Sequence, residues 1–185
     1  GYGAFIDNRA SVVNASVTVG GSNTFNNNYL SGLVVLTDGI ISLNSVNAST
    51  NGTVSNNGYG AFLDNTSGAG DVTLTGVNTF NTNDLTGLQV NTPGNFSASS
   101  VTVNGNGLAL VVGNGNGFDI ATVNGNVTIN GTNSFSNNFS TGLNVVTAGV
   151  VNLSGITAST NGTAADPGYG AFIDNRASVV NASVT

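Results

Sequence analysis

Aspartate is almost the only charged residue in this sequence, so any chemistry has to begin there. The 185 residues contain eight Asp and two Arg, and they contain no Glu, Lys, His or Cys. Asp7, Asp64 and Asp174 occupy the same place in a recurring Gly-Tyr-Gly-Ala-Phe-x-Asp-Asn motif. Two carboxylates about 5 to 10 Å apart can hydrolyse a glycosidic bond, one as the acid and the other as the base or nucleophile. The separation of these aspartates therefore decides whether they can act together.

The aspartates lack the partners that catalysis needs. General acid–base and nucleophilic catalysis commonly rely on a His, Lys or Cys beside the reacting group, and none of these residue types is present. Arg9 and Arg176 each follow an aspartate of the motif by two residues, which predicts a local surface ion pair of little energetic weight. We therefore predict that the protein is not an enzyme and has neither a catalytic residue nor a cofactor.

A metal site is not expected either, because thiolate and imidazole ligands are absent. Residues 115–120, Gly-Asn-Gly-Phe-Asp-Ile, are similar to one copy of the nonapeptide pattern of calcium-binding β-helix repeats. Such sites need tandem copies so that adjacent turns share the ions, and the flanking residues do not repeat the pattern. We interpret the segment as an inserted Gly-rich corner and predict no bound metal.

The composition is that of a folded, acidic chain with few charges. Hydrophobic residues make up 39% of the chain, the mean hydropathy is +0.16 and the formal net charge is −6. This is too apolar for a disordered polymer, and the lack of basic clusters argues against a nucleic-acid partner. No apolar run approaches the roughly 20 residues of a membrane-spanning helix, so we predict no membrane insertion.

The elements that must position these residues repeat along the chain with a 55-residue period. Residues 17–25 return as residues 72–80 and again as residues 127–135. Each unit divides into two halves of about 27 or 28 residues, and the half near Gly107 matches the pattern least well. The halves begin near Gly1, Tyr29, Gly58, Asp84, Gly107, Phe139 and Gly168.

A longer, 167-residue period encloses three of these units, because residues 1–18 and 168–185 are identical. We expect residues 1–185 to form one continuous segment of about six and a half rungs. Both ends carry ordinary repeat sequence without a cap. Since a free solenoid end exposes unpaired strand edges, we expect either an excerpt of a longer array or copies that stack end to end.

Apolar and polar residues alternate within each half, as at Val17 and Val19 or Ile41 and Leu43, which indicates short strands. Asn, Gly, Ser and Thr are poor helix formers, and Asn-Gly pairs supply the positive φ angles of sharp corners. The pattern predicts an all-β fold, a single-stranded parallel β-helix (β-solenoid) with three strands and about 28 residues per rung. We expect the right-handed form.

Stacked rungs place equivalent residues in columns along the axis. The same stacking separates the motif aspartates of neighbouring units by two rungs, roughly 10 Å, which favours a repeated surface position over a catalytic pair. The sequence also predicts two structural columns on alternate rungs, an asparagine ladder and an aromatic stack beside it. Their members are Asn23, Asn78, Asn133, Phe25, Phe80 and Phe135.

Phe5, Phe62 and Phe172 share one repeat position, which other rungs fill with polar residues such as Gln89 and Asn144. The polar residues predict an outward face, although a register shift of one residue would bury it. On an outward face the three rings could form a lateral contact between fibres or stack on a glycan. Both interpretations stay open.

Two segments carry a family resemblance. Residues 56–65, Asn-Asn-Gly-Tyr-Gly-Ala-Phe-Leu-Asp-Asn, and residues 142–153 resemble repeats of very large secreted bacterial proteins, the right-handed parallel β-helices of the pectin-lyase-like and adhesin type. The resemblance extends over the whole chain, and its motifs are specific for architecture. It implies an extracellular or cell-surface location, with a role in adhesion or in a filamentous envelope.

These observations favour a structural repeat segment of an extracellular filament, sheath or adhesin stalk, with further copies or neighbouring repeats as axial partners. A glycan- or surface-binding adhesin module is the alternative. Ice binding is a distant alternative, because Thr18, Thr73 and Thr128 recur only on alternate rungs, and a polysaccharide lyase is another. Asn-x-Ser/Thr triplets, such as those at Asn51 and Asn161, leave glycosylation open.

Overall fold

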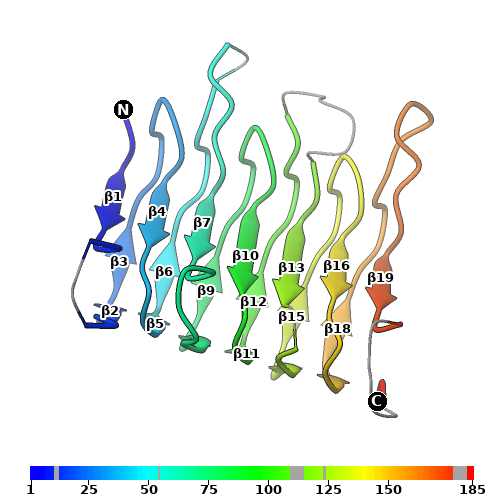
Figure 1. The fold of residues 1–185 in the computed structure, drawn as a ribbon. Helices are drawn as coiled ribbons and strands as arrows, with labels where there is room; N and C mark the ends of the chain where they lie inside the picture. Colours follow the sequence, from blue (N-terminus) through cyan, green and yellow to red (C-terminus); the bar gives the residue numbers. More distant parts are fainter. Residues whose placement is uncertain (11–12, 54, 109–114, 123, 177–182) are drawn as a thin grey trace.

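Three parallel sheets wind around one axis in the computed structural model, which describes residues 1–10, 13–53, 55–108, 115–122, 124–176 and 183–185. Each rung contributes one strand to each sheet, and equivalent strands lie about 28 residues apart. Figure 1 shows the rungs side by side along the axis. The predicted all-β solenoid with three strands per rung is confirmed.

The sheets are named A, B and C in the order in which the chain visits them, and one circuit is a rung, so that rung 1 holds β1, β2 and β3. Sheet A contains β1 (Ala4–Asp7), β4 (Leu33–Leu36), β7 (Ala61–Asp64), β10 (Leu88–Thr92), β13 (Phe118–Thr122), β16 (Leu143–Val146) and β19 (Ala171–Asp174). Sheet B contains β2 (Val17–Val19), β5 (Ile41–Asn44), β8 (Val72–Thr75), β11 (Phe96–Ser99), β14 (Val127–Asn130) and β17 (Val151–Leu153). Sheet C contains β3 (Asn23–Thr24), β6 (Val46–Asn47), β9 (Asn78–Thr79), β12 (Val101–Thr102), β15 (Asn133–Ser134) and β18 (Ile156–Thr157).

The chain runs down the front sheet and up the back sheet while it advances from left to right in Figure 1, which is the right-handed sense. The identical segments at the two ends, residues 1–7 and 168–174, form the same kind of strand in the same sheet. They are β1 and β19, which are six steps apart in sheet A. The 167-residue period is therefore a whole number of rungs.

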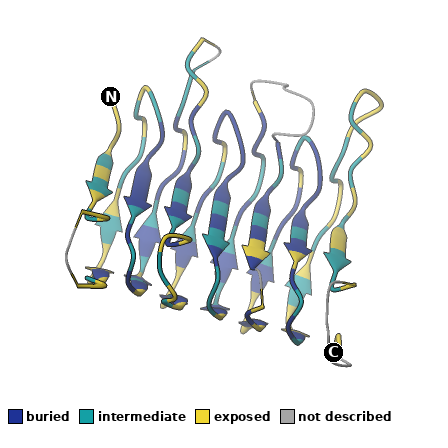
Figure 2. Cartoon of the chain, viewed as in Figure 1, coloured by how far each residue is buried: buried dark blue, intermediate teal, exposed yellow. Residues whose placement is uncertain are grey.

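Burial alternates from residue to residue along most strands, and Figure 2 shows this as bands of colour on β10 of sheet A. In β8, for example, Val72 and Leu74 are fully buried while Thr73 between them is half-buried on the outside. Complete burial of such an aliphatic side chain stabilises the fold by about 2 kcal/mol. Because each inward position is filled on every rung, the core is continuous along the axis.

The predicted phenylalanine column lies where sheet C ends. Phe80 and Phe135 are completely buried, and Phe25 is partly buried against the same core. The pairing of Thr79 with Thr102 puts the next residue, Val103, directly beside Phe80 on the following rung. The small side chains Ala48 and Ala158 hold the corresponding places beside Phe25 and Phe135. Large rings thus alternate with small residues, so that neighbouring rungs fill the interior without overlap.

The corner between sheets B and C turns on one residue with positive φ in every rung. Gly76 has φ of 69°, a conformation that glycine adopts without steric cost, and a Cβ there would lie 2.3 Å from the Oγ of Ser45. Ser45 adopts the same conformation with φ of 51°. The column is formed by Gly21, Ser45, Gly76, Ser100, Gly131 and Gly155.

A second column of positive φ begins the corner from sheet C to the next rung of sheet A. It includes Thr50, Thr82 and Thr160, although β-branched residues rarely adopt this conformation. From rung 2 to rung 3 and from rung 6 to rung 7 the connection is extended into an arch, and the cyan arch between rungs 2 and 3 is the tallest loop in Figure 1. In the arch between rungs 2 and 3 the two ends of the loop lie close together. A Cβ added to Gly52 would lie 2.6 Å from the backbone nitrogen of Gly58. Residues 109–114, which belong to the half near Gly107 that matches the repeat pattern least well, lie outside the described residues.

Candidate functional site

A continuous asparagine ladder follows the corner between sheets C and A. The side-chain amide of each Asn donates to the Oδ1 of the Asn on the next rung, with N···O distances of 2.9 to 3.1 Å. The same Oδ1 also accepts the backbone N–H of the donor residue, at 2.9 to 3.0 Å. Every rung from 1 to 6 is joined to its neighbour in this way. The members are Asn28, Asn51, Asn83, Asn106, Asn138 and Asn161.

The three asparagines predicted from the sequence to form a ladder lie elsewhere, at the start of the sheet C strands. Asn23, Asn78 and Asn133 are two rungs apart, and Val46 and Val101 occupy the same position on the rungs between them. The backbone N–H of Val46 donates to the Oδ1 of Asn78 at 3.0 Å, and that of Val101 to the Oδ1 of Asn133 at 2.9 Å. These side chains join neighbouring rungs through backbone atoms.

The sequence contains a signal for the continuous ladder, but a search with a uniform step of 28 residues does not detect it. One set of its members starts at Asn28 and follows the 55-residue period, and the other starts at Asn51, follows the same period and precedes a Gly each time. Along the axis the two sets alternate, with steps of 23 and 32 residues. The unequal steps arise because the arches lengthen every second connection.

The motif aspartates stand on the outward face of sheet A and do not face one another. Asp7 lies in β1 and Asp64 in β7, with β4 between them. The predicted ion pairs form at both ends, since Arg9 lies 2.6 Å from Asp7 and Arg176 lies 2.6 Å from Asp174. Hydrogen bonds from Arg176 lower the pKa of Asp174 to about 2, and those from Arg9 lower the pKa of Asp7. The carboxylates of Asp7 and Asp174 are therefore ionised surface groups.

Aromatic pairs occupy the outward face of sheet A. Phe5 pairs in register with Val34, and Val34 pairs with Phe62. Phe5 is 52% exposed, and its ring centroid lies 5.3 Å from that of Tyr2. Phe62 and Tyr59 form the same arrangement at 5.5 Å. Phe172 on the last rung repeats it with Tyr169, also at 5.5 Å, and is 38% exposed.

A groove of about 360 Å³ separates the first two aromatic pairs. It is lined by Ser31, Val34 and Leu36 of rung 2, by Tyr2 of rung 1 and by Tyr59 and Phe62 of rung 3. Val34 points outward but is only 7% exposed, because the large rings on both sides shield it. We name this surface the aromatic patch. It consists of Tyr2, Phe5, Val34, Leu36, Tyr59 and Phe62.

The next rungs of the same face carry amides around one carboxylate. Asp119 in β13 accepts a hydrogen bond from the Nδ2 of Asn144 at 2.8 Å and a long one from Asn116 at 3.4 Å. Gln89 on the preceding rung also donates to this carboxylate. Burial raises the pKa of Asp119, and these amide hydrogen bonds oppose the rise. We name Gln89, Asn116, Asp119 and Asn144 the amide cluster.

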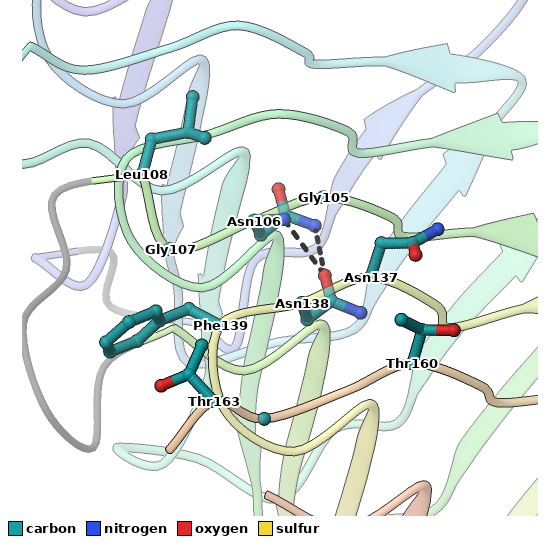
Figure 3. A pocket seen from close by; sticks show the side chains of 10 residues that line it. Gly105, Asn106, Gly107, Leu108, Asn137, Asn138, Phe139, Thr160 and Thr163 are labelled. Atoms are coloured by element: carbon teal, nitrogen blue, oxygen red, sulfur yellow. Dashed lines mark hydrogen bonds between the residues drawn. The ribbon is translucent and has the colours of Figure 1, made fainter. Parts of the chain in front are cut away.

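A separate hollow of about 360 Å³ lies at the base of the arches, on the ladder corner (Figure 3). Asn106 and Asn138 in its wall are held by the ladder hydrogen bond drawn in the figure, while Leu108 and Phe139 supply apolar surface. None of the ten described residues that line it carries an ionisable side chain. The hydroxyl groups of Thr160 and Thr163 therefore have no ionisable side chain beside them among the described lining residues.

Asp84 is a buried acid that sequence analysis did not single out as a site. It follows the ladder residue Asn83, at the corner position that Phe139 holds two rungs further on, and it is only 7% exposed. Its Oδ2 atom has no hydrogen-bond partner within the described part of the chain, and burial raises the pKa of the carboxyl group. Only its burial in the folded chain distinguishes it from the other isolated aspartates, so no sequence signal could have identified it.

The outward face of sheet B carries a hydroxyl column that is more complete than the sequence indicates. Thr18, Thr73 and Thr128 recur on alternate rungs, as predicted. Between them the register inserts Ser42 and Ser97, and the Oγ of Ser97 donates to the Oγ1 of Thr73 at 3.2 Å. The column therefore bears a hydroxyl group on each of rungs 1 to 5.

The candidate calcium segment, residues 115–120, leads into a strand of sheet A. Phe118, Asp119 and Ile120 of this segment belong to β13, and Asp119 uses its oxygens to accept amide hydrogen bonds. Among the residues that the structure describes, no group of three or more His, Cys, Asp or Glu side chains could hold a metal ion. The described part of the chain also contains no helix of the length and apolar character needed to cross a membrane.

Comparisons with protein-family models, with curated proteins and with solved structures gave no match. The function therefore has to be argued from the geometry of the solenoid and from its outward faces.

Proposed function

We propose that this chain is a structural segment of an extracellular filament, sheath or adhesin stalk, in which successive 167-residue repeats stack along one axis. The observation that carries the proposal is that the sequence period equals six complete rungs. A following repeat then begins in sheet A at the same angular position as the preceding one, so its strands continue the three sheets without a break. A pectin-lyase-like or adhesin-type architecture in a very large secreted protein would use the repeat in this way.

The interior supports a load-bearing role along the axis. Each rung is tied to the next by parallel strand pairing in three sheets and by the asparagine ladder. Stretching the solenoid along its axis pulls on all of these contacts together. The stability of such an array grows with each added rung, because each one contributes a further interface.

The experiment is electron cryo-microscopy of a recombinant chain with three joined copies of the 167-residue repeat. A continuous rod of 18 rungs, about 86 Å long at about 4.8 Å per rung, is expected. A string of separate particles with flexible joints would refute axial continuity. Labelling intact cells with an antibody against the chain tests the proposed surface location, since a filament or stalk must be reached without permeabilising the cell.

A glycan-binding adhesin module is the second candidate, and one observation favours it. Tyr59 and Phe62 stand beside the amide cluster on the same face, and rings next to amides and a carboxylate suit the faces and hydroxyl groups of a sugar. In this alternative Phe62→Gln and Asn144→Ala would both abolish binding on a glycan array. If both variants kept glycan binding, the support for this site would be removed.

A further inference from the structure

We propose that the aromatic patch is an interface between two copies of this chain, which pair side by side through sheet A. The inference rests on the proposed function in one respect, because the patch recurs along a row only where repeats stack axially. It goes beyond that function by naming a lateral partner and the surface that binds it.

The patch is apolar and has the shape of a ridge beside a groove. None of its six members carries a charge, and the ion pair of Asp7 and Arg9 stands at its edge. The aromatic pairs of rungs 1 and 3 are the ridges, and the groove over Val34 lies between them. Contiguous exposed apolar surface of this kind is a common mark of a protein contact.

The size of the patch indicates what kind of partner can use it. A stable protein interface commonly takes at least about 20 residues from each side, and a six-residue patch is far smaller. One contact is therefore weak, whereas a row of contacts on linked repeats gains strength through effective concentration. The row has a spacing of six rungs, about 29 Å. A second copy of the same array repeats its own patches at the same six-rung spacing, so all of its patches can be in contact at once. This favours a second copy over an unrelated partner.

A two-fold axis parallel to the strands, midway between β4 and β7, places the rung 3 ridge of each copy over the groove of the other copy. It sets rung 3 of one copy against rung 2 of the other. Phe62 then lies over the partner's Val34, and each Tyr59–Phe62 pair enters the groove of the other copy. Such a contact is isologous and closes as a pair, so it does not lead to unlimited lateral growth.

The charges on sheet A are compatible with this arrangement. In an array of joined repeats the same two-fold operation sets rung 5 of one repeat against rung 6 of a neighbouring repeat in the partner, so Asp119 faces the partner's Asn144. Asp64 on rung 3 faces the partner's Leu36 on rung 2, and in neither case does a carboxylate face another carboxylate. Carboxylates that faced each other at these described positions would repel the two copies, each of which already carries a formal net charge of −6.

The experiment uses the absence of cysteine from this chain. Leu36→Cys places one thiol in the groove, and a bis-maleimide of about 12 Å reach spans two facing sheets about 10 Å apart with an offset of one rung. The full 185-residue chain at high concentration should give a cross-linked dimer. Thr73→Cys, on the outward face of sheet B, is the matched control and should give only background cross-linking.

Phe62→Gln tests the patch itself, because Gln89 fills the same position on the neighbouring rung and the change is therefore compatible with the fold. Combined with Leu36→Cys, it should lower the dimer yield about tenfold or more. Equal cross-linking from Leu36→Cys and Thr73→Cys, or a yield unchanged by Phe62→Gln, would overturn the proposal. The proposal would also be overturned if the Leu36→Cys chain formed no dimer and Phe62→Gln abolished glycan binding.

The failure of this proposal differs from the failure of the proposed function. Continuous single rods that never pair would leave the axial role intact and refute the lateral one. Cross-linked dimers from the 185-residue chain, together with discontinuous joined repeats, would refute the axial role and leave the pairing surface.

Discussion

The buried carboxyl group of Asp84 shows how one residue couples stability to pH. Because burial raises its pKa above the ordinary value of 3.8, the folded state holds this proton to a higher pH than the unfolded state does. Its contribution to the free energy of unfolding therefore falls as the pH rises through the folded-state pKa and is lowest at neutral pH. Asp84→Asn should raise stability at pH 7 by about 1 kcal/mol, since a buried charge with an unsatisfied oxygen is removed.

Urea unfolding of wild type and Asp84→Asn at pH 7 and pH 4 measures this effect. The difference between the two chains isolates the residue, because Asp7 and Asp174 have lowered pKa values and lose stabilisation on acidification in both chains alike. The advantage of the variant should shrink toward pH 4. An advantage that grows on acidification would contradict the assigned direction.

At the scale of the elements, the side-chain hydrogen bonds of the asparagine ladder stabilise the corner between sheets C and A. Asn106 accepts hydrogen bonds from the backbone N–H and Nδ2 of Asn83 and donates to Asn138. Asn106→Ala leaves these buried groups without partners, so we expect a loss of about 3 kcal/mol. Thermal and urea unfolding check the size of the loss. Asn57→Ala, at an exposed arch position, is the control and should change stability by less than about 0.5 kcal/mol.

An equal loss of stability from both alanine variants would mean that the ladder adds nothing beyond the composition of the loop.

The element scale also explains which predictions from the sequence were met. Strands such as Val72–Thr75 were predictable, because alternation with period two is a local pattern. The continuous ladder was not, because its members become neighbours only after arches of different length have closed.

For the whole molecule, nearest-neighbour stacking predicts that protection from hydrogen exchange depends on flanking rungs. Among the described strands of the 185-residue chain, β19 pairs with β16 alone, whereas β10 lies between β7 and β13. In a chain with two joined repeats, the amides of residues 171–174 should exchange at least about tenfold more slowly than in the 185-residue chain, because a further strand covers them. Residues 88–92 serve as the internal control and should not change. Unaltered exchange at residues 171–174 would show that joined repeats do not stack.

The sequence by itself determined the fold class, the rung length and the six-rung period, because these follow from alternation and from exact repetition. It also identified Phe80 and Phe135 as members of a structural column. Only the tertiary structure decided that Asn51 and Asn83 form part of the ladder, that Ser42 and Ser97 fill the hydroxyl column, and that Asp84 is buried. The physical reason is that local patterns set the direction of each side chain, whereas the neighbours along the axis depend on the summed lengths of all corners in a rung.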